Sequence, residues 1–124
     1  MPVSYAFARA VLVLRMVGEY EPADIRIAIA TALGERRAPF LDGMLFDVSD
    51  SAVLAKRTPL EIRSMAAVLA HNRKEYGNRL ALVAGSDHAY GMMRLGCADV
   101  EAAGVASRCF RVAGDALEWL EGRA

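Results

Sequence analysis

Three short apolar runs, separated by segments with helical spacing, constrain the fold of this chain most strongly. The runs occupy residues 10–18, 43–48 and 78–85, and the last two are almost continuously apolar. Such runs are typical of strands that are covered by helices on both faces. Strands that alternate with helices pair in parallel through right-handed crossovers. The sequence therefore predicts an α/β fold with a mostly parallel sheet.

We expect the elements in the order strand-strand-helix-strand-helix-strand-helix-strand-helix. The first two strands, which are joined tightly, should add an antiparallel member, giving a mixed five-stranded sheet with about four helices. Gly18 ends the second strand, and Pro22 occupies a first-turn position of the first helix. The expected strands are residues 4–9, 10–18, 43–48, 78–85 and 107–112. The expected helices are about a dozen residues from Pro22, then 59–74, Ser86 or Asp87 to Gly104, and 114–122.

The composition is that of a globular domain. The chain is 55% apolar and 24% charged, and no repeat, linker or low-complexity segment divides it, so we expect residues 1–124 to form a single domain. Fifteen basic residues balance fifteen acidic ones, which argues against nucleic acid as a partner. The apolar start is interrupted by Arg9 and Arg15 and lacks a basic leader, and no stretch is long enough to cross a bilayer. We expect a cytoplasmic protein with no transmembrane segment.

Cys97 and Cys109 have the spacing of neither a redox motif nor a zinc site. We expect buried free thiols, while a disulfide between the two stays open. No cluster of histidine, cysteine and carboxylate residues indicates a metal site, and no glycine-rich nucleotide loop is present. The sequence predicts neither a metal nor another cofactor.

The closing stretch "RCFRVAGDALEWLEG" carries a resemblance to a known superfamily. Together with the order of elements, it resembles the SpoIIAA-like branch of the STAS superfamily, named for sulfate transporters and anti-sigma-factor antagonists. In that branch a late strand with an Arg-x-Phe-Arg pattern leads into a helix with Ala-Leu-x-Trp-Leu. The resemblance implies a SpoIIAA-like fold and a regulatory role. The matching residues are Arg108, Phe110, Arg111, Ala116, Leu117, Trp119 and Leu120.

The same resemblance implies a functional residue at the start of the second helix. Anti-sigma antagonists of the superfamily are switched by phosphorylation of a serine there, after a strand that ends in an aspartate. Asp47 could match that aspartate, and Thr58 falls near the phosphorylated position. Where the superfamily has Asp-Ser-Ser-Gly, this chain reads Lys56-Arg57-Thr58-Pro59.

The residues around Thr58 have two interpretations of their own. Thr58-Pro59-Leu60-Glu61 has the pattern of a capping box with proline at the first helical position, which explains it as a helix start. A helix N-terminus beside two basic residues could also hold an anion or contact a partner. The candidate partner-binding, anion-binding or regulatory residues are Asp47, Ser49, Lys56, Arg57 and Thr58.

The segment "GSDHAYGMMR" raises a second candidate at the same carboxyl edge of the sheet. Serine and aspartate are preferred helix caps, and a consecutive Ser-Asp-His trio lacks the arrangement of a catalytic triad. Two adjacent methionines cannot both face one core, so one of them could face a crevice that accepts an apolar ligand. The candidate crevice residues are Ser86, Asp87, His88, Tyr90, Met92 and Met93.

These features favour a non-enzymatic regulatory or interaction module that binds a protein partner near the start of the second helix. The alternative is a carrier or sensor of a small anionic amphiphile, a fatty acid or phospholipid, in a crevice at the carboxyl edge of the sheet. No catalytic constellation in the sequence predicts an enzyme. A homodimer through an edge strand or the Trp119 helix also stays open.

Overall fold

Strands and helices alternate along the chain in the order that the sequence predicts. The computed structural model describes residues 3–35, 40–51 and 56–122. Its strands are β1 (Val3–Ala8), β2 (Val11–Val17), β3 (Gly43–Asp50), β4 (Arg79–Val83) and β5 (Ala106–Phe110). Its helices are α1 (Pro22–Glu35), α2 (Pro59–His71), α3 (Asp87–Ala102) and α4 (Ala113–Leu120). The predicted α/β class and order of elements are confirmed.

The described strands form one sheet whose spatial order follows the chain, β1-β2-β3-β4-β5. β1 pairs antiparallel with β2, and the remaining pairs are parallel, as expected for a tight hairpin followed by crossovers through helices. Leu14 lies opposite Phe46, which lies opposite Leu82, so an apolar row crosses the three central strands. The mixed, mostly parallel five-stranded sheet is thus confirmed.

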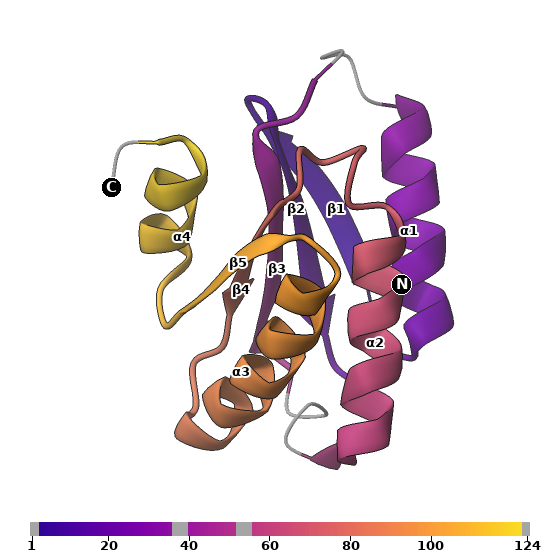
Figure 1. Cartoon of the computed structure of the whole chain (residues 1–124), viewed down its shortest axis with the longest axis vertical. Coiled ribbons are helices and arrows are strands. Elements are labelled where there is room, and N and C mark those ends of the chain that lie inside the picture. The colour runs from indigo at the N-terminus through magenta and orange to yellow at the C-terminus, as the bar shows by residue number, and fades with distance from the viewer. Residues whose placement is uncertain (1–2, 36–39, 52–55, 123–124) are drawn as a thin grey trace.

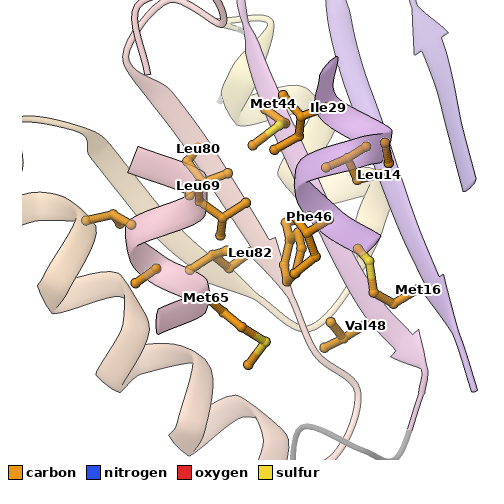
Figure 2. Packing of buried hydrophobic residues seen from close by; sticks show 14 of the residues in the cluster. Leu14, Met16, Ile29, Met44, Phe46, Val48, Met65, Leu69, Leu80 and Leu82 are labelled. Carbon is orange, nitrogen blue, oxygen red and sulfur yellow. The ribbon is translucent and has the colours of Figure 1, made fainter. Parts of the chain in front are cut away.

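Three helices cover one face of the sheet. Figure 1 shows α1, α2 and α3 on that face and α4 apart from them. Side chains of a strand alternate between its two faces, and in Figure 2 those of β2, β3 and β4 point toward α1 and α2. This buried cluster is the main core of the molecule. Its labelled members in Figure 2 are Leu14, Met16, Ile29, Met44, Phe46, Val48, Met65, Leu69, Leu80 and Leu82.

α4 covers part of the opposite face with a much smaller apolar cluster. Arg79 of β4 contacts the end of this helix in two ways. Its guanidinium lies 4.6 Å from the centre of the Trp119 ring and donates to the Trp119 carbonyl oxygen at 2.7 Å. The Trp119 ring also packs on Phe110, with 5.8 Å between ring centres. Trp119 is therefore turned onto its own sheet. The buried residues of the small cluster are Val11, Leu45, Ala81, Val83, Ala116 and Leu120.

Several element ends differ from the sequence prediction by two or three residues, and two of them have a clear cause. α2 ends at His71 rather than Lys74, because the chain turns there and returns the Tyr76 side chain to the core. The Tyr76 hydroxyl donates to the Leu69 carbonyl oxygen at 2.7 Å, near the end of the helix. β5 ends at Phe110, two positions before the predicted end, since α4 already begins at residue 113.

Candidate functional site

α2 and α3 begin at the same edge of the sheet. They follow the parallel strands β3 and β4, so both helices start at the carboxyl edge, which lies at the lower end of the molecule in Figure 1. In open sheets of this kind, ligand and regulatory sites lie outside the carboxyl ends of the strands. The candidate residues predicted from the sequence fall at this edge, on the end of β3 or on α3.

The predicted capping box at the start of α2 is present. The Thr58 hydroxyl oxygen accepts from the Glu61 backbone N–H at 3.2 Å, and the Glu61 carboxylate accepts from the Thr58 backbone N–H at 3.0 Å. Pro59 follows in the first turn, where its missing N–H leaves no helical bond unmade. Thr58 is exposed, but its oxygen already serves the helix. The interpretation of this stretch as a helix start is confirmed.

Arg57 is turned into the protein rather than toward solvent. Its side chain is 11% exposed, and its guanidinium donates to the Glu61 carboxylate at 2.9 Å and to the Tyr20 carbonyl oxygen. A second carboxylate, that of Glu21, lies 3.5 Å away. Although burial alone would lower the pKa of Arg57, the hydrogen bond to Glu61 and the charge of Glu21 raise it. The charge of Arg57, expected at an anion site, thus meets the protein's own acidic groups.

Asp47 lies on the other face of the sheet from α2. The resemblance implied that Asp47 ends its strand, but β3 continues to Asp50. Asp47 stands between Phe46 and Val48, which belong to the core under α1 and α2, so its side chain points away from that core and from Thr58. Ser49 is exposed, lies where the β2–β3 register shifts, and donates its backbone N–H to the Asp47 carboxylate at 2.9 Å.

A small exposed surface remains at the start of α2. We call it the helix-start surface, and it consists of Lys56, Thr58, Pro59 and Leu60. Leu60 is 73% exposed, whereas Ile62, Met65 and Leu69 of the same helix are buried. The capping box and the Arg57 contacts hold the turn that carries it.

At the start of α3 the Ser-Asp-His trio is used for capping and pairing. The Ser86 hydroxyl oxygen accepts from the Ala89 backbone N–H at 3.1 Å and caps the helix, as expected. The Asp87 carboxylate pairs with the Arg111 guanidinium at 2.8 Å, and His88 is exposed. In the part of the chain that the structure describes, no hydrogen bond joins Ser86 to His88.

Arg111 is a residue of this edge whose role the sequence did not indicate. Besides pairing with Asp87, its guanidinium lies 4.3 Å from the centre of the Tyr90 ring. The Arg-x-Phe-Arg pattern around the end of β5 includes Arg111, but its two partners, Asp87 and Tyr90, are distant from it in the sequence. Tyr90 is half-buried and packs against the main core, but it does not line the crevice between α2 and α3; it borders a groove with Cys97 and Cys109 instead.

Met92 and Met93 line an apolar crevice between α2 and α3. Its cavity volume is about 30 Å³, and Met93 is buried while Met92 is half-buried. Only one of the two methionines was expected to border a crevice, but both do. Consecutive residues on a helix are about 100° apart, so both can flank a groove that runs beside the helix. Ser86, Asp87, His88 and Tyr90 do not line it. The lining residues are Phe46, Ile62, Met65, Ala66, Leu69, Leu82, Met92, Met93, Gly96 and Val100.

Comparison with known proteins identifies the fold. No protein-family model matches the chain, and no curated protein matches it. A solved structure does: an uncharacterised protein of the DUF3478 family from Shewanella loihica PV-4, described as having a SpoIIAA-like fold. The two share 15% sequence identity with a TM-score of 0.60, over 95% of this chain and 91% of the other. This chain has a SpoIIAA-like fold.

At 15% identity, the similarity between the two chains concerns the fold alone. The resemblance predicted from the sequence is confirmed at this level. Among the described residues, no group of three or more histidine, cysteine or carboxylate side chains could hold a metal ion. The helices that the structure describes are all too short or too polar to cross a bilayer.

Proposed function

We propose that this SpoIIAA-like chain is a non-enzymatic interaction module that binds a protein partner through the helix-start surface. The observation that carries the proposal is Leu60, an exposed apolar side chain on a turn held by the capping box and Arg57. A partner that covers Leu60 gains apolar burial, and little ordering of this turn is required on binding. Lys56 is exposed beside it and favours a partner with an acidic group at the contact.

The polar side chains at this edge are already engaged in structural contacts, which supports a binding role over a catalytic one. The hydroxyl oxygens of Thr58 and Ser86 serve as helix caps, and the Asp87 carboxylate is paired with Arg111. A nucleophile needs a general base within hydrogen-bond reach. The Glu61 carboxylate beside the Thr58 hydroxyl already accepts from the Thr58 backbone N–H and from Arg57, and among the described residues Ser86 is hydrogen-bonded to no acidic or basic side chain.

The alternative role, carriage of an anionic amphiphile, has less support. The crevice between α2 and α3 offers about 30 Å³, whereas an engineered apolar cavity that binds benzene has roughly 150 Å³. Its lining contains no charged residue that could hold a headgroup. An acyl chain would therefore have to part the two helices, and its headgroup would have to reach beyond the crevice.

Affinity capture with matched variants tests the proposed partner site. The purified full chain is immobilised and exposed to extract of its source cells, in parallel with Leu60→Ser and Lys56→Glu. We expect a discrete protein that the parent retains and Leu60→Ser loses. With that protein purified, calorimetry should show binding weakened by Leu60→Ser by roughly tenfold or more, as for the loss of an interface anchor.

Ile27→Ser is the matched control, because Ile27 is also an exposed aliphatic residue, 52% exposed, but lies on α1. It should leave capture and affinity unchanged. Circular dichroism should show that each variant keeps the parent's secondary structure. A partner retained equally by Leu60→Ser and Ile27→Ser, or no protein retained by the parent, would contradict the proposal.

A further inference from the structure

The fold brings the two cysteines together at the β5 edge of the sheet, on the face that α3 covers. Cys97 lies on α3 and Cys109 on β5, and both are free and half-buried. β5 is the last strand of the described sheet, so its far side is open. Both cysteines line one surface groove of about 600 Å³, together with Arg94, Glu101, Ser107 and Arg108 among others. A small oxidant in solution can therefore reach them.

The contacts around the two sulfur atoms give them different roles. The Cys97 Sγ lies 2.9 Å from the Ser107 hydroxyl oxygen. The Ser107 hydroxyl has one proton, which it donates either to that sulfur or to the Cys97 carbonyl oxygen, 3.3 Å away. Cys109 follows Ser107 by two residues on β5, so both side chains lie on the same face of that strand, beside Cys97 in the groove. The Cys97 thiol, while it is protonated, also donates to the Glu101 carboxylate at 3.7 Å. Among the described residues, the polar contacts therefore converge on Cys97 rather than on Cys109.

On balance, the groups around Cys97 favour its thiolate over its thiol. The hydrogen bond from Cys109 is the largest influence and lowers the pKa of Cys97 to about 7, with help from Ser107 and against partial burial and the Glu101 charge. The same hydrogen bond raises the pKa of Cys109, since it must keep its proton to donate it. Near neutral pH the pair therefore holds a reactive thiolate beside a protonated thiol. A low-pKa, accessible cysteine beside a second cysteine is typical of peroxide-sensitive sites.

We propose that Cys97 and Cys109 form a peroxide-oxidisable pair, in which Cys97 is oxidised first and Cys109 then closes a disulfide between α3 and β5. This site is independent of the helix-start surface. It uses other residues, on other elements, and needs no partner protein.

The chemistry balances with hydrogen peroxide as the oxidant. The Cys97 thiolate attacks one peroxide oxygen, the O–O bond breaks, and Cys97 becomes a sulfenic acid while hydroxide leaves and takes up a proton as water. The Cys109 thiol then loses its proton, and its sulfur attacks the Cys97 sulfur. The S–O bond breaks and the oxygen leaves with that proton and its own as a second water. Two thiols are oxidised to one disulfide, and one peroxide is reduced to two waters.

Loss of the Cys97 charge prepares the second step. The raised pKa of Cys109 depends first on its hydrogen bond to Cys97, and the Cys97 charge adds to it. A neutral sulfenic acid at Cys97 removes that charge, while the nearby Arg94 still favours a thiolate at Cys109. The resolving thiol is therefore restrained before the first oxidation and released by it.

Intact-mass measurement of the reduced full chain tests the pair. The protein is treated with graded hydrogen peroxide at neutral pH, the remaining thiols are alkylated, and the products are separated without reductant. We expect the parent to lose two hydrogens, to gain no oxygen, and to become resistant to alkylation at both cysteines. Cys109→Ser should instead gain one oxygen at Cys97, which dimedone traps. Cys97→Ser should lose its remaining thiol on the order of tenfold more slowly than the parent, because the thiolate is the reactive form.

Several results would overturn the inference. They are a parent that gains oxygen without closing the disulfide, disulfides only between two chains, and a Cys97→Ser variant that reacts as fast as the parent. Serine is close in size to cysteine, and circular dichroism of both variants should match that of the parent.

Discussion

Tyr20 and Arg57 fill the junction between the loop after β2 and the start of α2. The Arg57 guanidinium lies 6.0 Å from the centre of the Tyr20 ring and donates to the Tyr20 carbonyl oxygen. The Tyr20 side chain is buried, and its hydroxyl has no hydrogen-bond partner among the described residues. Burial raises the pKa of Tyr20, while the Arg57 charge opposes the change. A buried hydroxyl without a partner is a cost to the folded state.

The two most buried tyrosines should respond in opposite ways to loss of the hydroxyl. Tyr20 is 1% exposed and Tyr76 is 0% exposed, but the Tyr76 hydroxyl donates to Leu69. Tyr20→Phe should raise the free energy of unfolding by about 1 kcal/mol, because an unpaired polar group leaves the interior. Tyr76→Phe should lower it by about 1 kcal/mol, because a hydrogen bond is lost.

Urea denaturation followed by circular dichroism measures both changes. Each variant is the other's control, since the same atom is removed from a tyrosine of equal burial. Equal destabilisation by both substitutions would mean that the Tyr20 hydroxyl is hydrogen-bonded in solution.

At the scale of elements, the start of α2 depends on the charge of one carboxylate. The backbone N–H of Thr58, and then the Arg57 guanidinium, lower the pKa of Glu61 below its ordinary value of 4.5. A carboxyl whose pKa is lower in the folded state stabilises that state above the ordinary pKa. This contribution is lost as the pH falls from about 4.5 through the lowered pKa.

In Glu61→Gln, the melting temperature of the chain should therefore fall less than that of the parent when the pH is lowered. At neutral pH the variant should melt at a lower temperature than the parent, because glutamine lacks the charge that Thr58 and Arg57 favour. Below about pH 4.5 the two melting temperatures should converge. Differential scanning calorimetry across this range measures the difference. A difference that stays constant down to the acid end would show that the Glu61 charge does not stabilise the helix start.

α4 sits against β3 so closely that no side chain fits between them at Gly43. A Cβ atom at Gly43 would lie 2.5 Å from Leu120 Cδ2 and 3.1 Å from the Arg79 carbonyl oxygen. Gly43→Ala should lower the free energy of unfolding by about 1–3 kcal/mol, because the core there is already filled. Gly34→Ala is the control: a Cβ at this α1 position meets nothing within 4 Å, and alanine favours a helix by up to about 1 kcal/mol. Urea denaturation of the two variants should give changes of opposite sign, and stabilisation by both would contradict the close packing of α4.

The elements could be predicted from the sequence because local patterns determine them. Runs such as residues 43–48 and 78–85 are apolar on both faces, and Thr58 with Glu61 has cap spacing that does not depend on distant parts of the chain. The element ends were less accurate where a distant contact intervenes. α2 stops three residues early because Tyr76 returns to the core, which local spacing does not encode.

The candidate site could be predicted only in part, for the same reason. Arg57 was expected to face an anion, but its direction depends on Glu21 and on the carbonyl of Tyr20, which belong to another loop. The meeting of Cys97 with Cys109 depends on how α3 lies across β5, and their spacing in the sequence gives no sign of it. Chemistry that rests on tertiary pairing becomes visible only in the folded chain.

At the scale of the whole molecule, the two faces of the sheet are covered unequally. Three helices bury the main core, whereas α4 is eight residues long and buries two of them, Ala116 and Leu120. Local opening requires the least free energy where few apolar contacts are broken. α4 should therefore open without the rest of the molecule.

Native-state hydrogen exchange measures this difference directly. We expect the backbone amides of β3 and β4, which have a strand on each side, to exchange slowest. The amides of α4 should exchange roughly tenfold or more faster. Leu120→Ala should speed exchange in α4 more than in β3. Equal rates in α4 and the central strands would show that this helix opens only when the whole fold does.

The spatial order of the strands has a consequence for the way the chain is made. Because β1 to β5 lie side by side in the order in which they occur in the sequence, no strand has to insert between two that are already paired. A chain leaving the ribosome can form its first hairpin and then extend the growing edge, one strand and one crossover at a time. At each step of synthesis, the neighbour that a new strand requires has already emerged.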